Sequence, residues 1–207
     1  MTGRDGPIVV IKVGGSLFTD PTLRSRLSAY LVGFVGRRPV LIAGGGVMVD
    51  AIRDLDRIHD LGERRCHALA LRVLDATADF LASLVPHSLV VDSLSDLPSL
   101  WSSGLIPIAR PRSILDHDDR AAPDQAPLPH TWAVTSDSIA ARIALLLSAD
   151  GLLLLKSVPP PRGPLAPPYV DAYFSRVANR LVSVEALGFR LEDSVEKSGP
   201  GACPSGS

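Results

Sequence analysis

The chain has 207 residues, of which 46% are hydrophobic and 21% are charged, a balance typical of globular domains rather than of disordered or membrane-embedded chains. A formal net charge of −1 provides no long-range field to attract nucleic acid or an anionic membrane. The only two cysteines, Cys66 and Cys203, form neither a disulfide framework nor a spaced metal cluster. These features predict that neither nucleic acid nor a membrane is the partner.

The N-terminal segment lacks the apolar core of a signal peptide, because its hydrophobic run Ile8–Val13 is short and contains Lys12. The apolar stretch Ile143–Leu155 is interrupted by polar residues and is too short to span a bilayer. These features predict a cytoplasmic protein. The length predicts one domain over residues 1–197, and the Gly/Pro/Ser-rich segment 198–207 a disordered tail.

Strands and helices are predicted to alternate along the chain. The predicted strands are Ile8–Val13, Val40–Ala43, Leu89–Val91, Leu105–Ala109 and Leu152–Leu155. The predicted helices lie at 20–35, directly after Gly44-Gly45-Gly46, at 63–85 and at 135–147. The polar segment 116–129 is predicted to be a surface loop, and prolines forbid regular structure from 159 to about 169. Repeated strand, glycine turn and helix predict an α/β fold whose open parallel sheet is covered on both faces.

Capping residues predict one helix start, and the spacing of apolar residues predicts which side of a helix faces inward. Asp20-Pro21 is typical of a helix start, with Asp20 as N-cap. In the helix after the glycine triplet, Val49, Ile52 and Leu55 are expected to face inward. In the helix at 63–85, the residues at helical spacing are Leu69, Val73, Ala76, Phe80 and Leu84.

The first candidate site segment is Lys12-Val13-Gly14-Gly15-Ser16, at the carboxyl end of the first strand. Open α/β sheets bind ligands outside the carboxyl ends of their strands. Glycine amides and the Ser16 hydroxyl are suited to phosphate oxygens, and Lys12 to the charge of a transferring phosphoryl group. The alternative is a tight turn beside a lysine that reaches solvent.

The second segment is Gly44-Gly45-Gly46, again between a strand and a helix. Three glycines indicate either positive φ angles or close approach of a ligand. The segment is not a P-loop, because no Gly-Lys-Ser/Thr follows, nor a dinucleotide fingerprint, because Val49 replaces its last glycine. A strand–helix packing turn remains the alternative.

The third segment is Thr135-Ser136-Asp137-Ser138 at a helix start, and Lys156 follows a buried strand. Ser136 or Asp137 would cap the helix in the simplest interpretation. Alternatively, the Asp137 carboxylate would hold lysine ammonium groups in place. Lys156 is a phosphate-ligand candidate because it lies at the carboxyl end of a strand.

Together these segments resemble the amino acid kinase superfamily. The resembling motifs are Lys12-Val13-Gly14-Gly15-Ser16, Gly44-Gly45-Gly46 and Ser136-Asp137-Ser138-Ile139-Ala140. The resemblance implies a three-layer α/β/α sandwich around a mainly parallel open sheet. It implies ATP as phosphoryl donor and a small-molecule substrate, with Mg²⁺ held mainly by the ATP phosphates and no metal site in the protein. Homo-oligomers are common among such proteins.

The resemblance also implies site roles. The catalytic residues would be Lys12 and Asp137. The ATP-binding residues would be Gly14, Gly15, Ser16, Thr135, Ser136 and Lys156. The acceptor-binding residues would be Gly44, Gly45, Gly46, Asp50, Arg53 and His67. Arg53, Arg57 and Arg72 are basic residues available to grip a phosphate or a carboxylate.

The chain resembles most a short branch typified by aminomethylfuran methyl phosphate kinases, which convert a phosphate monoester to a diphosphate. The further resembling stretches are Gly44–Arg53, His67 with Ala70-Leu71, Trp132–Ala140 and Tyr169–Phe174. The uridylate kinases have an arginine where this chain has Asp50. Lys156-Ser157-Val158 departs from the superfamily's usual nucleotide-binding segment, and Arg162 follows it. The expected function is phosphorylation of an aminomethylfuran methyl phosphate for a methanofuran-type cofactor; the alternatives are a carboxylate kinase and a non-catalytic nucleotide-binding or storage protein.

Overall fold

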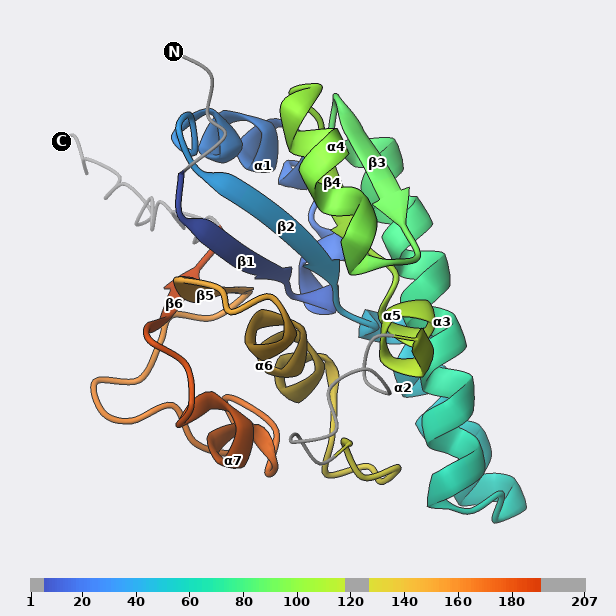
Figure 1. Cartoon of the computed structure of the whole chain (residues 1–207). Helices are drawn as coiled ribbons and strands as arrows, with labels where there is room; N and C mark the ends of the chain where they lie inside the picture. The colour runs from blue at the N-terminus through green and yellow to red at the C-terminus, as the bar shows by residue number, and fades with distance from the viewer. Residues whose placement is uncertain (1–5, 118–126, 191–207) are drawn as a thin grey trace, which may run out of the picture.

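A six-stranded parallel sheet forms the centre of the computed structural model, which describes residues 6–117 and 127–190 (Figure 1). The strands are β1 (Ile8–Val13), β2 (Arg38–Ala43), β3 (Ser88–Val91), β4 (Ile106–Ala109), β5 (Gly151–Lys156) and β6 (Val184–Gly188), in the spatial order β3-β4-β2-β1-β5-β6. The predicted α/β class and five of these strands are confirmed; β6 was not predicted. The tail at 198–207 and the end of the expected domain at 197 lie outside the described residues.

The central strands deliver two lysines to the same face of the sheet. Successive strand residues alternate between faces, so Lys12 shares a face with Val10, and Lys156 shares one with Leu154. Val10 and Leu154 belong to the same core cluster, and β1 pairs with β5 in a register that sets Lys12 beside Leu154. Both lysines therefore emerge on one face at the carboxyl edge of the sheet.

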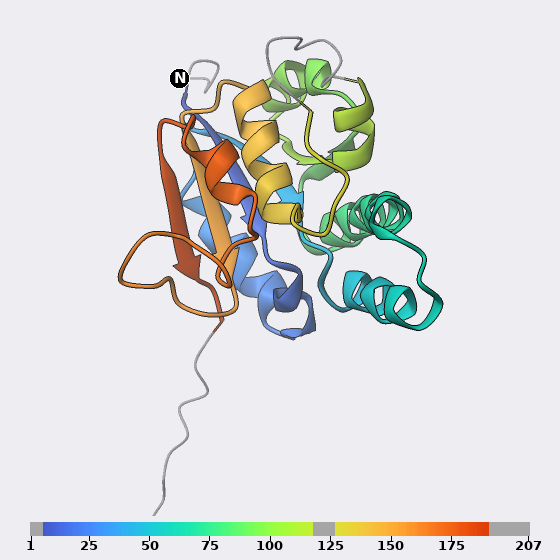
Figure 2. The ribbon, with the colours of Figure 1, turned by 90° about the horizontal axis from the view of Figure 1, so that it is seen from below.

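Helices cover both faces (Figure 2). On one face α1 (Leu23–Val32) and the second half of α3 (Glu63–Leu84) pack on the sheet. The other face is covered by α4 (Leu97–Ser102), α5 (Pro111–His117), α6 (Ser136–Leu146) and α7 (Phe174–Ala178). This arrangement confirms the three-layer sandwich that the resemblance implied.

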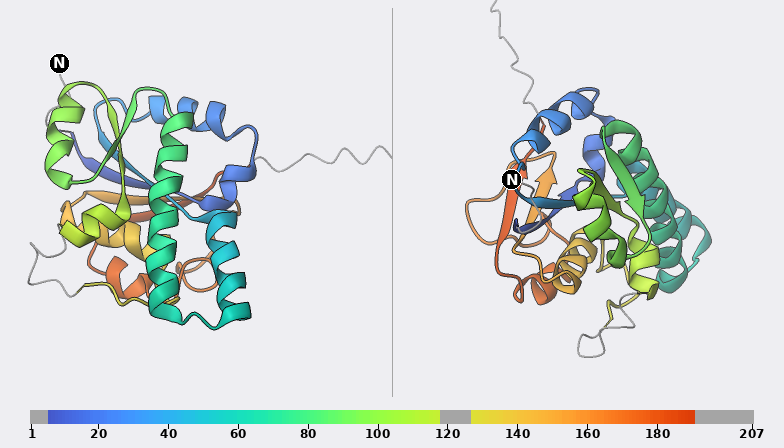
Figure 3. Two further views of the ribbon diagram at one scale, coloured as in Figure 1. Left: turned by 90° about the vertical axis from the view of Figure 1, so that its right-hand side faces the viewer. Right: turned by 45° about the horizontal axis from the view of Figure 1, so that its top comes forward.

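The first half of α3 and helix α2 (Gly46–His59) extend past the sheet as an antiparallel pair (Figure 3). Their predicted faces were partly wrong: Leu55 is 48% exposed and Phe80 37% exposed, whereas Leu71, Leu74 and Leu81 are buried. Both helices carry apolar residues on more than one side, so spacing alone does not select the stripe that meets the sheet. Among the described residues, no helix is long and apolar enough to cross a membrane.

Two local predictions are also corrected. Helix α1 begins at Leu23 rather than at Asp20-Pro21, because a 3-10 helix, η1 (Gly15–Thr19), comes first. The Asp20 carboxylate accepts hydrogen bonds from the backbone N–H of Thr22 (2.9 Å) and from its hydroxyl (2.7 Å) instead of capping a helix. Asp116 belongs to α5, not to the predicted loop, most of which lies outside the described residues.

Candidate active site

A cavity of about 230 Å³ opens at the carboxyl edge of the sheet, between the turns after β1 and β2, helix α3 and the start of α6. The predicted site residues that line it are Lys12, Gly14, Gly15, Ser16, Gly45, Gly46, Asp50, Arg53, His67, Thr135, Ser136 and Lys156. The other two, Gly44 and Asp137, contact this lining from behind: Gly44 packs on Gly15, and Asp137 pairs with both lysines. The structure thus gathers residues that are up to 144 positions apart in the chain (Lys12 to Lys156) into one site.

The centre of the site is one buried carboxylate between two ammonium groups. Asp137 lies in the first turn of α6 and is 4% exposed. Its Oδ1 forms an ion pair with Lys12 Nζ at 2.9 Å, and its Oδ2 accepts a hydrogen bond from Lys156 Nζ at 2.6 Å. Lys156 also donates to the backbone carbonyl of Tyr169 at 2.6 Å. Two positive groups and one negative group leave a net positive charge, which favours an anionic ligand.

Burial and charge act in opposite directions on these groups. Burial disfavours the Asp137 carboxylate, but the two lysines outweigh it and hold the pKa of Asp137 below its ordinary value. Burial and the neighbouring Lys12 lower the pKa of Lys156, against the attraction of Asp137. The helix-cap alternative for Asp137 is therefore wrong, because its carboxylate contacts lysines instead of the α6 backbone.

The two glycine turns pack directly on each other. A Cβ at Gly15 would lie 2.1 Å from the backbone nitrogen of Gly46, and a Cβ at Gly46 would lie 2.5 Å from the Gly15 carbonyl oxygen. Gly46 also has a φ of +54°, where side chains are unfavourable. Both positions therefore require glycine for close packing, so the alternative of a packing turn holds as well. The same packing leaves the turn backbone exposed to the cavity.

Asp171, which the sequence analysis did not assign to the site, fixes the start of α6. Its Oδ2 accepts hydrogen bonds from the Thr135 N–H (3.0 Å), the Thr135 hydroxyl (2.8 Å) and the Ser138 N–H (2.9 Å). Its Oδ1 accepts from the Ser138 hydroxyl and from the Tyr173 N–H. A side chain 36 positions away thus performs the capping role, and leaves Asp137 free to face the lysines.

The part of the cavity farther from the sheet is formed by Trp132 and residues of α2 and α3. The Trp132 indole N–H donates to Asp56 Oδ2 at 2.9 Å, and the Arg53 guanidinium lies 5.0 Å from the centre of the indole ring. Arg53 also pairs with Asp50 at 2.5 Å. Trp132 was part of a resembling stretch but had received no role; its partners are too distant in the chain to be recognised from the sequence.

His67 lines the same outer part, and is 3% exposed. Neither of its ring nitrogens has a hydrogen-bond partner among the described residues. Its ring stacks on that of His130, with centroids 5.1 Å apart and planes 14° apart. Burial, with a smaller contribution from His130, lowers the pKa of His67 from 6.5 to about 4, so the imidazole is neutral at pH 7.

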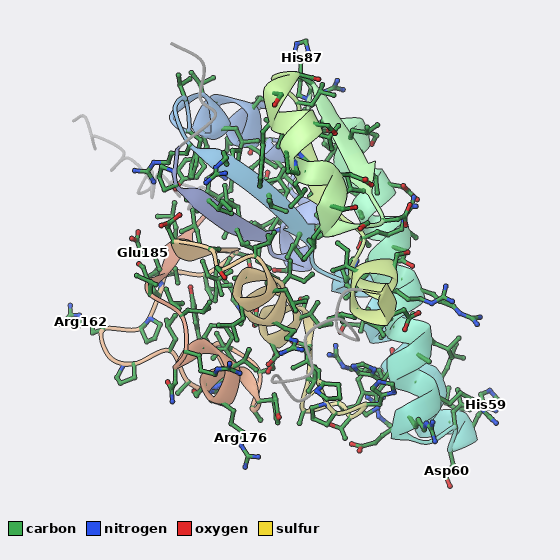
Figure 4. All side chains as sticks on the ribbon, in the orientation of Figure 1. His59, Asp60, His87, Arg162, Arg176 and Glu185 are labelled. Carbon is green, nitrogen blue, oxygen red and sulfur yellow. The ribbon has the colours of Figure 1, made fainter. Side chains whose placement is uncertain are left out.

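Three other basic residues named from the sequence lie outside the cavity. Arg57 is exposed and pairs with Asp54 at 3.0 Å, and Arg72 is exposed on α3. Arg162 points outward from the proline-rich loop after β5 (Figure 4). Only Arg53 of the candidate arginines lines the cavity. The segment Lys156-Ser157, which differs from the usual nucleotide-binding segment of the superfamily, contacts the first glycine turn. The Ser16 and Ser157 hydroxyls form a 2.9 Å hydrogen bond.

Comparison with known proteins identifies a family match: the model of the amino acid kinase family matches residues 7–160. Among curated proteins, the chain is 27% identical over 149 residues to the (5-(aminomethyl)furan-3-yl)methyl phosphate kinase of Methanocaldococcus jannaschii, covering 72% of this chain and 65% of that one. It is 24% identical over 201 residues to the acetylglutamate kinase of Paracidovorax citrulli, covering 74% of this chain and 65% of that one. The chain thus spans just under two thirds of the length of these relatives.

The fold also resembles solved kinase structures. The uridylate kinase of Archaeoglobus fulgidus superposes with a TM-score of 0.52 at 18% identity, covering 75% of this chain and 68% of that one. The UMP kinase of Ureaplasma parvum superposes with a TM-score of 0.53 at 14% identity, covering 73% and 69%. At these identities the likeness concerns the fold alone.

Proposed function

The chain belongs to the amino acid kinase family, and on this premise we propose that it transfers a phosphoryl group from ATP to a small phosphate monoester, forming a diphosphate. The observation that supports this most is the pairing of Lys12 and Lys156 on the buried carboxylate of Asp137. A buried net positive charge at the carboxyl edge of the sheet stabilises the negative charge that phosphoryl transfer gathers in one place.

In the proposed reaction an oxygen of the acceptor phosphate attacks the γ-phosphorus of ATP. The bond from that phosphorus to the bridging oxygen breaks, and ADP leaves with the bond's electron pair. Lys12, the more buried lysine, would stabilise the equatorial oxygens of the transferring group. Lys156 would hold the ATP phosphates before and during transfer. Asp137 would fix both ammonium groups, so that they need not reorganise as charge develops.

The inner end of the cavity has the donors that a phosphate chain requires. Lysine ammonium groups, the backbone of Gly15 and Ser16, and serine or threonine hydroxyls all line it, whereas the Gly14 N–H already donates to the Leu155 carbonyl at 2.8 Å. This donor set suits phosphate oxygens rather than a metal ion. Mg²⁺ would accordingly be bound by ATP phosphate oxygens and water, where it neutralises charge.

The acceptor would lie beside Gly45 and Gly46, with its body between α3 and α6. Arg53 lines this side of the cavity, but it is paired with Asp50. A monoester phosphate would therefore be attracted to the lysine end, where the net charge is positive. The relative from Methanocaldococcus jannaschii, which is named as a kinase of an aminomethylfuran methyl phosphate, supports a furan phosphate as the first acceptor to test.

A carboxylate acceptor, which would yield an acyl phosphate, is the second candidate. It is favoured by the similarity to acetylglutamate kinases, including 39% identity over 82 residues with the chloroplastic enzyme of Arabidopsis thaliana, covering 39% of this chain and 22% of that one. The same charged centre would serve this reaction, because a carboxylate oxygen would replace the phosphate oxygen as nucleophile.

The test is ADP formation from ATP and Mg²⁺ with a panel of acceptors: furan and other small-ring methyl phosphates, UMP, N-acetylglutamate and aspartate. We expect turnover with the ring phosphates, and its loss in Asp137→Asn. Turnover of N-acetylglutamate alone would transfer the assignment to the carboxylate kinases. If ATP binds but no acceptor is turned over, the non-catalytic alternative replaces the proposal.

A further inference from the structure

The cavity has an outer end that contains a buried polar side chain without a partner. Leu74 of α3 approaches the glycine triplet, since its Cδ2 lies 3.5 Å from a Cβ position built on Gly45. His67 precedes Leu74 by seven residues, so it lies on the same side of α3, about 10 Å farther from the sheet at 1.5 Å of helix rise per residue. His67 thus lies two helical turns farther out than Leu74, which approaches the glycine triplet.

We propose that His67 recognises a hydroxyl or amino group on the end of the acceptor opposite its reacting phosphate. The inference rests on the proposed function for the identity of the ligand as acceptor. The direct observation is the burial of both imidazole nitrogens without a partner among the described residues, in a side chain that lines the cavity. An unpaired buried polar group destabilises the site, and a ligand group that forms a hydrogen bond to it would remove that cost.

The surroundings of His67 keep its ring in one place. His130 stacks on one face of the imidazole. The neighbouring wall, Trp132, is held by its hydrogen bond to Asp56 and by the Arg53 guanidinium over its ring. Binding would therefore require little reordering of these side chains. A hydrogen bond to His67 would then increase the affinity for the acceptor, because little conformational entropy is lost.

The chemistry of the outer end favours an uncharged or cationic group over an anion. The imidazole is neutral at pH 7, and Arg53 is already paired with Asp50, so no unpaired positive charge among the described lining residues faces this end. A neutral imidazole has one donor and one acceptor nitrogen, and a hydroxyl or amino group can satisfy either of them. A carboxylate or phosphate can only accept, and would face a single N–H.

The middle of the cavity defines the acceptor's body. Between the two ends the lining is apolar, with Leu71, Leu74, Val134 and Ile139. The helix rise sets His67 about 10 Å from Leu74, so the apolar part of the cavity is long enough for one ring with a short arm. A small ring with a methyl phosphate on one arm and a hydroxyl or amino group on the other is an acceptor class that fits this lining.

The test compares the binding of three furan methyl phosphates that differ only on the far arm: aminomethyl, hydroxymethyl and methyl. Calorimetry is performed on wild type, His67→Phe, His67→Asn and His130→Phe. We expect wild type to bind the aminomethyl and hydroxymethyl compounds at least about tenfold more tightly than the methyl compound, a difference of about 1.4 kcal/mol. The aminomethyl compound carries an ammonium group that Asp50 could attract, whereas the hydroxymethyl compound is uncharged. Tight binding of the hydroxymethyl compound therefore indicates hydrogen bonding rather than charge attraction.

The preference should disappear in His67→Phe, persist in His130→Phe, and return in part in His67→Asn, whose amide still donates and accepts. Equal binding of the three compounds by wild type would overturn the proposal without any variant, as would a preference that survives in His67→Phe or no binding at all. Turnover is measured separately: a binding preference without phosphoryl transfer overturns the proposed function only, and transfer without a preference overturns the role of His67 only.

Discussion

The two ends of the cavity differ in what builds them. At the inner end, lysines at the carboxyl ends of β1 and β5 meet the first turn of α6, where the Asp137 carboxylate lies within hydrogen-bonding distance of both. At the outer end, α2, α3 and the segment before α6 contribute rings and apolar side chains with a neutral histidine. In the proposed function, the charged inner end would carry out phosphoryl transfer, whereas the outer end would select the acceptor.

This difference indicates that changes at the inner end should act mainly on the rate of transfer, and changes at the outer end on acceptor affinity. Two of the inner charges, Lys12 and Lys156, lie on the buried central strands, and the third, Asp137, lies in the buried first turn of α6. The outer residues lie on a helical pair that extends past the sheet. The following predictions test that division, from the largest expected effect to the smallest.

Asp137→Asn should reduce kcat by a factor of about a hundred to a thousand, because the two lysines lose the charge that orients them. Steady-state kinetics at saturating ATP and acceptor measure the loss. Asp79→Asn is the matched control, since Asp79 also pairs with a cation, Arg110 at 2.6 Å, but is exposed and away from the cavity. A variant that retains near wild-type kcat would remove Asp137 from catalysis.

The two lysines should separate in kinetics. Lys12→Ala should lower kcat by roughly a hundredfold with near-normal ATP binding, because its contact strengthens in the transition state. Lys156→Ala should raise the KM for ATP as well as slow the reaction, because it would hold the phosphates in the ground state. Calorimetry of ATP binding together with kcat distinguishes the two. If the variants exchange behaviours, the assigned roles are reversed.

Asp171→Asn should lower kcat by about tenfold, equivalent to 1.4 kcal/mol, because a weaker clamp on Thr135 and Ser138 lets Asp137 shift from the lysines. Stability should fall by about 1 kcal/mol, as for a lost helix cap. Asp150→Asn is the control, because Asp150 Oδ2 also accepts a backbone hydrogen bond, from Ile8 at 2.8 Å, away from the site. A positioning role requires that only Asp171→Asn lowers kcat when both variants are assayed well below their unfolding temperatures.

The smallest effect near neutral pH concerns the titration of His67, whose contribution to stability changes only as the pH falls. Because the pKa of His67 is lowered from 6.5 to about 4, the unfolded chain binds the additional proton between these values, and stability falls as the pH drops through that window. The loss should reach up to about 3 kcal/mol by pH 4. From pH 6 to 8, where both an ordinary histidine and the acceptor phosphate titrate, the acceptor KM should follow the same pH profile in wild type and in His67→Phe.

Urea unfolding at several pH values measures this dependence. His67→Phe should flatten it, and replacement of the exposed His87 by asparagine should not (Figure 4). An unchanged slope in His67→Phe, or a change of acceptor KM around pH 6.5 that occurs in wild type but not in His67→Phe, would show that His67 is not held neutral.

The sequence alone determined the α/β class, five of the six strands and which residues gather at the inner end of the cavity. This was possible because the carboxyl ends of parallel strands lie at one edge of the sheet, where ligands bind. Lys12 and Lys156 follow buried apolar runs, so both are expected at that edge. The glycine turns were visible for the same reason, since each directly follows a strand.

The tertiary structure decided what depends on contacts between distant segments. Asp171 lies 36 positions from Thr135, and Trp132 lies 76 positions from Asp56, so no local pattern reveals either pair. It also decided which stripe of α3 is buried, because α3 meets α2 along one half and the sheet along the other. Hydrophobic spacing gives the period of a helix, but only the neighbouring elements determine which side of it is removed from water.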